Sequence, residues 1–162
     1  FTCSITFEQN YGGVEGDSAS LAEAVAVISD LSGLPVRQDI AITGSMNQRG
    51  EAQVVGGVVH KVEGFFKACK SAPSGLTGTQ GAIVPARNVR NLVLDAEVVA
   101  AVAAGQFHLW AVDDLDEALE LLLGTDQGDL HANGDYSPGS IFGKVSEQLI
   151  EFNEILGKIG II

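Results

Sequence analysis

The chain has 162 residues, of which 46% are apolar and 19% charged, and its 9 Lys and Arg residues against 21 Asp and Glu residues give a net charge of −12. This length predicts one domain with a real core, and the apolar content argues against a disordered chain. The acidic balance and the lack of a Lys/Arg stripe argue against non-specific nucleic-acid binding, and no apolar run approaches the ~18 residues of a membrane span.

Strand and helix patterns alternate through the first half of the chain. Short runs of β-branched and apolar residues indicate strands, and apolar residues spaced three and four apart indicate helices. Asp17 is the expected N-cap of the first helix, and Gly33 its expected end. In chain order we predict a strand at 2–8, a Gly-rich loop at 10–16, a helix at 17–33, a strand at 39–43, a turn at 46–50, a return strand at 51–55 and a helix to about residue 70.

The second half continues this alternation and ends in a tail. Its predicted segments are a flexible loop at 71–80, a buried strand at 82–85, a helix at 98–104, a strand at 107–112, a helix at 115–123, a polar linker at 124–139 and an amphipathic helix at 141–156. One face of this last helix carries Val145, Leu149, Phe152 and Leu156, an apolar stripe that something must cover. Alternating helices and short strands predict an α/β or α+β class with a mixed sheet.

The cysteines and the chain ends bear on the origin of the protein. Cys3 and Cys69 are too few for a disulfide framework, which favours a reducing compartment. No signal-peptide pattern opens the chain, so we expect a cytoplasmic protein. The chain starts at Phe1 and its only methionine is Met46, so we expect it to be cut from a longer polypeptide.

The segment 16–20 (GDSAS) is the first candidate for chemistry. Ser18 stands behind a Gly-rich loop at the predicted start of a helix, where free backbone amides and the helix dipole favour a negative charge. Such amides can hold an oxyanion beside a serine nucleophile. The alternative is a cluster of helix-capping residues without chemistry.

A serine nucleophile needs a base, and the candidates are a lysine and three histidines. Lys61 follows Gly56-Gly57 among apolar residues, and burial disfavours the charged form of a lysine, so Lys61 can act as the base of a Ser-Lys pair. Alternatively, its side chain extends along its helix to solvent. His60 would complete a classical serine hydrolase triad, whereas His108 is expected in a buried strand and His131 in the polar tail.

Three segments in register resemble the proteolytic domain of the Lon family of ATP-dependent proteases, closest to its archaeal and bacterial Lon-like branch. They are GVEGDSAS at 13–20, AITGS at 41–45 and GGVVHK at 56–61. The 43 residues from Ser18 to Lys61 and the 18 from Thr43 to Lys61 match the spacing of the family. The resemblance spans about residues 4–123, and it is stronger than any one segment alone.

The resemblance implies roles for individual residues. Ser18 is then the nucleophile, Lys61 the general base, and Thr43 the residue that positions the lysine amine. The amides of Ser18 and Asp17 form the oxyanion hole, and Glu15 matches an acidic position in the preceding loop. Asp17 and Ser20 stand where the main bacterial type has Pro and Gly.

The resemblance also implies a fold and partners. The expected fold is α+β, with the mixed sheets and packed helices of ribosomal protein S5 domain 2. The expected domains are a proteolytic domain at 1–124 and an extension at 125–162. Because the family has additional strands upstream of the serine, we expect either that part of the sheet is missing here or that a second polypeptide piece supplies it. The expected function is a serine endopeptidase that degrades unfolded or damaged proteins within a ring, usually a hexamer, joined in the same chain to a AAA+ ATPase module.

Cofactors are expected only outside this chain. It has no phosphate-binding Gly-Lys-Ser/Thr motif and no paired Cys or His spacing for zinc, so ATP and Mg²⁺ are expected on the ATPase module. The rival interpretation is a non-catalytic Lon-like oligomerisation or scaffold domain, against which the presence of both Ser18 and Lys61 argues.

Overall fold

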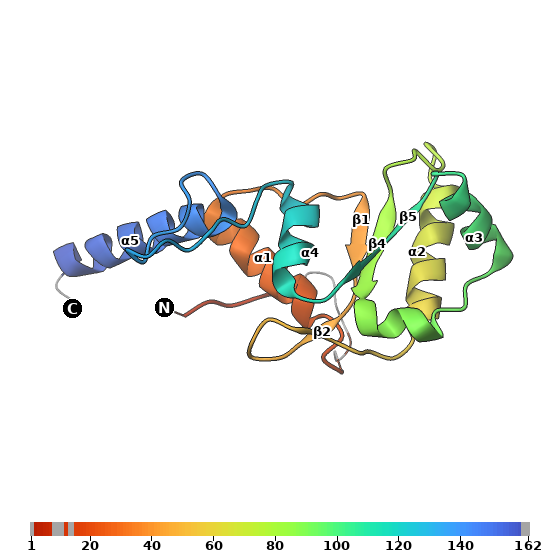
Figure 1. Ribbon diagram of the computed structural model, residues 1–162, viewed down its shortest axis with the longest axis horizontal. Helices are drawn as coiled ribbons and strands as arrows, with labels where there is room; N and C mark the ends of the chain where they lie inside the picture. The colour runs from red at the N-terminus through yellow and green to blue at the C-terminus, as the bar shows by residue number, and fades with distance from the viewer. Residues whose placement is uncertain (1, 8–11, 13–14, 160–162) are drawn as a thin grey trace.

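A computed structural model describes residues 2–7, 12 and 15–159 of the chain. Figure 1 shows its helices and strands. In chain order these are α1 (Ser20–Ser32), β1 (Ile40–Ile42), β2 (Ser45–Met46), β3 (Ala52–Gln53), α2 (Val58–Ser71), β4 (Gly81–Pro85), the 3₁₀ helix η1 (Ala86–Asn91), α3 (Ala96–Ala103), β5 (His108–Val112), α4 (Leu115–Leu123) and α5 (Ile141–Ile159).

A parallel sheet of three strands, in the order β1-β4-β5, forms the middle layer. All five residues of the central strand β4 are buried, as expected for a parallel strand covered on both faces. Helices α1 and α4 lie on one face and helices α2 and α3 on the other (Figure 1). With the antiparallel pair β2-β3, this confirms the predicted α+β class with mixed sheets and packed helices.

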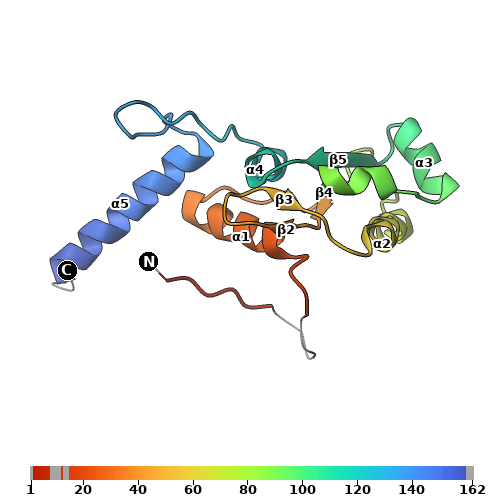
Figure 2. The same cartoon turned by 60° about the horizontal axis from the view of Figure 1, so that its bottom comes forward.

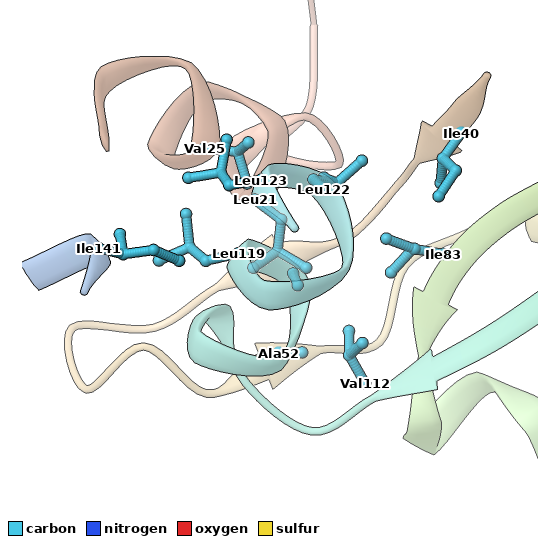
Figure 3. Packing of buried hydrophobic residues seen from close by; sticks show 11 residues of the cluster. Leu21, Val25, Ile40, Ala52, Ile83, Val112, Leu119, Leu122, Leu123 and Ile141 are labelled. Atoms are coloured by element: carbon cyan, nitrogen blue, oxygen red, sulfur yellow. The ribbon is translucent and has the colours of Figure 1, made fainter. Parts of the chain in front are cut away.

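The alternation of side chains along β4 divides the interior into two cores. Ile83 faces the core beneath α1 and α4, where it joins Leu21, Leu119 and Ile141 (Figure 3). Ala82 and Val84 face the second core, which contains Val62, Phe66, Val98 and Phe107 from α2, α3 and the residue before β5. Helices α1 and α2 therefore lie on opposite faces of the same sheet. The sheet determines how residues at the first turns of the two helices are placed relative to each other.

Helix α1 begins three residues later than predicted. Its N-cap is Ala19, which makes no side-chain capping bond, so the expectation that Asp17 caps this helix is wrong. The carboxylate of Asp17 instead accepts a hydrogen bond from Ser45, which removes it from the capping position. The end is as predicted, because Gly33 adopts the left-handed C-cap conformation at φ 67°.

One strand prediction is wrong, and another strand is shorter than predicted. Residues 2–7 belong to no strand and are exposed, because no other described strand pairs with them; residue 8 and most of the predicted loop at 10–16 lie outside the described residues. The predicted return strand at 51–55 is present as β3 (Ala52–Gln53), which pairs with β2 and not with β1. Gly44 separates β1 from β2, so the hairpin is β2-β3, while β1 pairs in parallel with β4.

The final helix packs at its start and projects at its end. Ile141 is fully buried in the first core and Val145 is 8% exposed, so the first turns of α5 lie on the domain. Leu149, Phe152 and Leu156 are 38%, 38% and 40% exposed, and Figure 2 shows this end of α5 leading away from the layers. The predicted apolar stripe is therefore covered over only its first part.

Candidate active site

Ser18 lies in the turn that leads into α1. The carbonyl of Asp17 accepts hydrogen bonds from the Ser20 amide at 3.1 Å and the Ser20 hydroxyl at 2.7 Å, which closes the turn around Ser18. Within the described residues, the amides of Asp17 and Ser18 donate to no other group. Two amides at the positive end of a helix are therefore available to a negative oxygen.

Lys61 and Thr43 meet Ser18 from two other elements. Lys61, in the first turn of α2, donates a hydrogen bond from Nζ to Ser18 Oγ at 2.7 Å and another to Thr43 Oγ1 at 3.1 Å. Thr43 follows β1 and is 8% exposed, and its hydroxyl donates to the Ser18 carbonyl at 3.2 Å. Three residues spread over 43 positions of the sequence thus share one hydrogen-bonded cluster.

The segment after β1 also contacts the Ser18 turn through its backbone. The Gly44 amide donates to the Ser18 carbonyl at 2.9 Å, and the Leu21 amide donates to the Gly44 carbonyl at 3.1 Å. A side chain at Gly44 would overlap Leu21 Cδ1, so this close approach of β1 to α1 requires glycine.

A cavity of about 290 Å³ opens beside these residues. Its lining is small and apolar apart from the three clustered side chains, and consists of Ser18, Ala19, Ala22, Ala41, Ile42, Thr43, Lys61, Val62, Ala82 and Ile83. A larger depression of about 820 Å³ follows the exposed end of α5 and includes none of the three clustered residues.

The structure decides between the two environments that the sequence leaves open for Lys61. Its side chain is exposed, so the chain itself does not enclose the amine among apolar groups; the apolar residues of α2 at Val58, Val62 and Phe66 point into the second core instead. Among the described residues no carboxylate lies within 4.0 Å of Lys61 Nζ. The partners of the amine are the two hydroxyl groups.

The other candidates lie apart from this cluster. Glu15 is exposed and forms no hydrogen bond or ion pair with another described residue, and His60 and His131 are exposed as well. His108 is half-buried, where its Nε2 pairs with the Gly78 carbonyl at 2.8 Å and its ring stacks on Trp110. None of the three histidines hydrogen-bonds to Ser18.

One residue of the site has a contact that the sequence does not predict. Ser45 is 6% exposed, and its hydroxyl donates to Asp17 Oδ2 at 2.6 Å. Ser45 ends the segment AITGS at 41–45 that carries the family resemblance, but nothing in the sequence pairs it with Asp17, because the two residues are 28 positions apart.

Residues 11–125 match the family described as the Lon protease (S16) C-terminal proteolytic domain. The chain belongs to the Lon protease family. It is 56% identical over 123 residues to a Lon protease homolog of Escherichia coli K12, an alignment that covers 76% of this chain and 21% of that protein. It is 37% identical over 119 residues to the archaeal Lon protease of Thermococcus kodakarensis, covering 74% and 16%. The family is one of serine peptidases, so the chain carries a peptidase domain.

The matches cover a small part of the longer relatives. The chain spans 22% of the Lon protease homolog of Haemophilus influenzae, to which it is 47% identical over 137 residues.

Within residues 2–7, 12 and 15–159, no helix is long and apolar enough to span a membrane.

Proposed function

We propose that this chain is an endopeptidase domain in which Ser18 is the nucleophile and Lys61 the general base. The observation that carries the proposal is the 2.7 Å hydrogen bond between Lys61 Nζ and Ser18 Oγ at the mouth of a cavity. A nucleophile within hydrogen-bond reach of its base, with a third group holding the base, is the arrangement that acyl transfer needs. Thr43 Oγ1, 3.1 Å from Lys61 Nζ, is the third group.

The reaction then follows from the geometry. Neutral Lys61 accepts the hydroxyl proton of Ser18 as Oγ attacks the scissile carbonyl carbon, and it returns that proton to the leaving amine when the carbon–nitrogen bond breaks. A water then gives a proton to Lys61 and attacks the Ser18 ester; Lys61 passes this proton to Ser18 Oγ as the ester bond breaks, which releases the carboxylate product and restores both the serine hydroxyl and the neutral lysine. The amides of Ser18 and Asp17 hold the negative oxygen of each tetrahedral intermediate. Among the described residues, neither amide donates a hydrogen bond to another group.

The exposure of Lys61 bears on the protonation state that this mechanism requires. A lysine in contact with water retains its proton more readily than a desolvated one. We propose that the bound polypeptide covers the cavity and removes water from Nζ, whose described partners are the hydroxyls of Ser18 and Thr43.

At the level of the whole protein, we propose the proteolytic module of an ATP-dependent protease that degrades unfolded or damaged proteins. The relatives are several times longer than the matched region, which leaves room for an ATPase module in the same chain. ATP and Mg²⁺ would bind to that module, and a homo-oligomeric ring, of six copies in the arrangement we favour, would enclose the open site so that only threaded chains reach it. Glu15, which is exposed three residues before Ser18, would face such a chain.

The first test removes each member of the dyad in the natural full-length protein. Ser18→Ala and Lys61→Ala should each lower kcat for an unfolded protein substrate by about 10⁴-fold, and the double substitution should lower it no further, because both side chains act in one step. His60→Ala is the matched control, since His60 is the exposed neighbour of Lys61.

Two outcomes would contradict the proposal. Near-native turnover by Lys61→Ala with loss in His60→Ala would assign the base to the histidine. Wild-type protein that hydrolyses nothing in the presence of ATP and Mg²⁺ would favour a non-catalytic assembly module.

A further inference from the structure

The carboxylate of Asp17 forms a hydrogen bond that the dyad does not require. Ser45 Oγ donates to Asp17 Oδ2 at 2.6 Å, the length of a strong bond from a hydroxyl to a carboxylate. Asp17 itself is exposed, whereas Ser45 is 6% exposed. The exposed carboxylate of Asp17 is thus hydrogen-bonded to the buried hydroxyl of Ser45.

This bond acts on the peptide unit that precedes the nucleophile. The carbonyl of Ser18 is already fixed from the β1 side by the Gly44 amide and the Thr43 hydroxyl. The preceding peptide unit contains the Asp17 carbonyl and the Ser18 N–H, which point in opposite directions in a trans peptide. Ser20 donates hydrogen bonds to the Asp17 carbonyl, and Ser45, which lies outside the turn, donates one to the Asp17 side chain. Together these hydrogen bonds set the direction of the Ser18 N–H.

The anchor belongs to a paired strand and not to a loose loop. Ser45 is the first residue of β2 and pairs in register with Gln53 of β3. A hydroxyl on a paired strand holds its partner more tightly than one on a loop, which matters where a displacement of about 1 Å costs on the order of a hundredfold in rate.

We propose that Ser45 and Asp17 are positioning residues for the peptidase reaction: their hydrogen bond aims the Ser18 amide and the Ser18 hydroxyl toward the carbonyl under attack. The inference rests on the proposed function of Ser18 as the nucleophile. The side chains of Ser45 and Asp17 act through Ser18 and touch no reacting atom themselves.

The test measures how fast Ser18 reacts with a fluorophosphonate probe in the natural full-length protein. In this reaction Ser18 Oγ bonds to phosphorus, fluoride leaves, and the serine proton passes to Lys61. We expect Ser45→Ala and Asp17→Ala each to slow labelling about ten- to a hundredfold. We expect Asp17→Asn, which keeps an acceptor oxygen, to recover most of the rate, and Ser45→Ala with Asp17→Ala to be no slower than either alone.

Ser140→Ala is the matched control for the loss of a buried hydroxyl. Ser140 is also 6% exposed, and its hydroxyl donates to the Ser137 carbonyl at 2.6 Å in the tail before α5. We expect this variant to label at the wild-type rate although its thermal midpoint falls as much as that of Ser45→Ala. Equal slowing in both variants would overturn the inference, because the effect would then be general destabilisation.

The remaining outcomes separate the inference from the proposed function. Labelling of Ser45→Ala and Asp17→Ala at the wild-type rate, with no labelling of Ser18→Ala, would overturn the positioning role alone. Wild-type labelling at a residue other than Ser18 would overturn both. If Ser45→Ala does not fold, exposed Asp17 carries the test, because Asp17→Ala removes the same bond from the solvent side.

Discussion

At the scale of single residues, the Thr43 hydroxyl connects both members of the proposed dyad. It accepts from Lys61 Nζ at 3.1 Å and donates to the Ser18 carbonyl at 3.2 Å. Because a hydroxyl has one proton to donate and two lone pairs to accept, it can form both bonds at once. Thr43 therefore fixes the lysine amine relative to the serine backbone.

Replacing this hydroxyl by a methyl group should affect the rate more than the stability. Thr43→Val keeps the shape of the side chain and loses both bonds; we expect kcat to fall about ten- to a hundredfold, since hydrogen bonds to charged groups are worth about 1.5–3 kcal/mol. Steady-state kinetics and urea denaturation measure the two effects. Thr43→Ser keeps the hydroxyl and should retain most activity; a fully active Thr43→Val enzyme would leave Thr43 with a packing role only.

How much of the site is visible in the sequence differs from residue to residue. Ser18, Lys61 and Thr43 were selected by three segments in register, and the structure brings these three within hydrogen-bond distance. Ser45 was missed, because its importance depends on a side-chain contact across 28 residues. The sequence leaves open whether Lys61 is enclosed or extends to solvent; the structure shows it exposed, since its apolar neighbours in the sequence lie on the other face of its helix.

At the scale of elements, the close approach of β1 to α1 depends on Gly44. A Cβ at this position would overlap Leu21 Cδ1 and lie 3.2 Å from Pro85 Cγ, and Leu21 is fully buried in the first core. We expect Gly44→Ala to lower the free energy of unfolding by about 1–3 kcal/mol, as overpacking does. Because the Gly44 amide binds the Ser18 carbonyl, kcat should fall as well.

Gly64 provides the matched comparison within α2. A Cβ there would meet no atom within 4 Å, so Gly64→Ala should raise the stability of the helix by about 0.5–1 kcal/mol. Urea denaturation of the 162-residue chain measures both variants. Equal losses in the two would show that the contact with Leu21 is not what requires glycine at position 44.

An ion pair fixes the chain just before β1. The Arg37 guanidinium donates to both oxygens of Asp39, at 3.0 and 2.7 Å, and these bonds lower the pKa of Asp39 to about 2. The pKa in the unfolded chain is about 3.9, so the folded state favours the ionised carboxylate. The resulting stabilisation is present above about pH 4 and is lost as the pH falls toward 2.

This predicts a pH-dependent effect of Asp39→Asn. Because the two side chains are 41% and 31% exposed, solvent screening limits the loss at pH 7 to about 1 kcal/mol or less. Urea denaturation at several pH values should show this difference shrinking between pH 4 and 2, and Arg37→Ala should abolish it. A difference that stays constant down to pH 2 would contradict the role of the ion pair.

The elements also show which sequence patterns are informative. Helices α2 and α4 were predicted almost to the residue, because their apolar spacing agrees with the face they bury. The strand predicted at 2–8 shows the opposite case. Apolar and polar side chains alternate along its described residues 2–7, as they do in a strand. A strand also needs a second strand to pair with, and the pattern of side chains does not identify one. The pairing of β1 with β4 was likewise outside the reach of local patterns.

At the scale of the whole molecule, α5 enters the hydrophobic core of the domain through its first turn. Ile141 is fully buried beside Leu21 and Val25, whereas Leu156 is 40% exposed on the same helix. A depression of about 820 Å³ follows the exposed part and is lined by Leu149, Phe152 and Leu156. The boundary predicted at 124–125 therefore separates sequence segments that share one hydrophobic core.

Because α5 is buried at its start and exposed near its end, replacing an apolar residue by alanine should affect the stability of the chain differently at the two ends. Ile141→Ala should lower the free energy of unfolding of the 162-residue chain by about 2–4 kcal/mol, because it leaves a cavity in the core. Leu156→Ala should change it by about 0.5 kcal/mol or less if the chain is monomeric. Urea denaturation at low and high protein concentration checks both. A loss in Leu156→Ala that grows with protein concentration would show instead that copies of the chain cover this end of α5, since association stabilises the folded state by mass action.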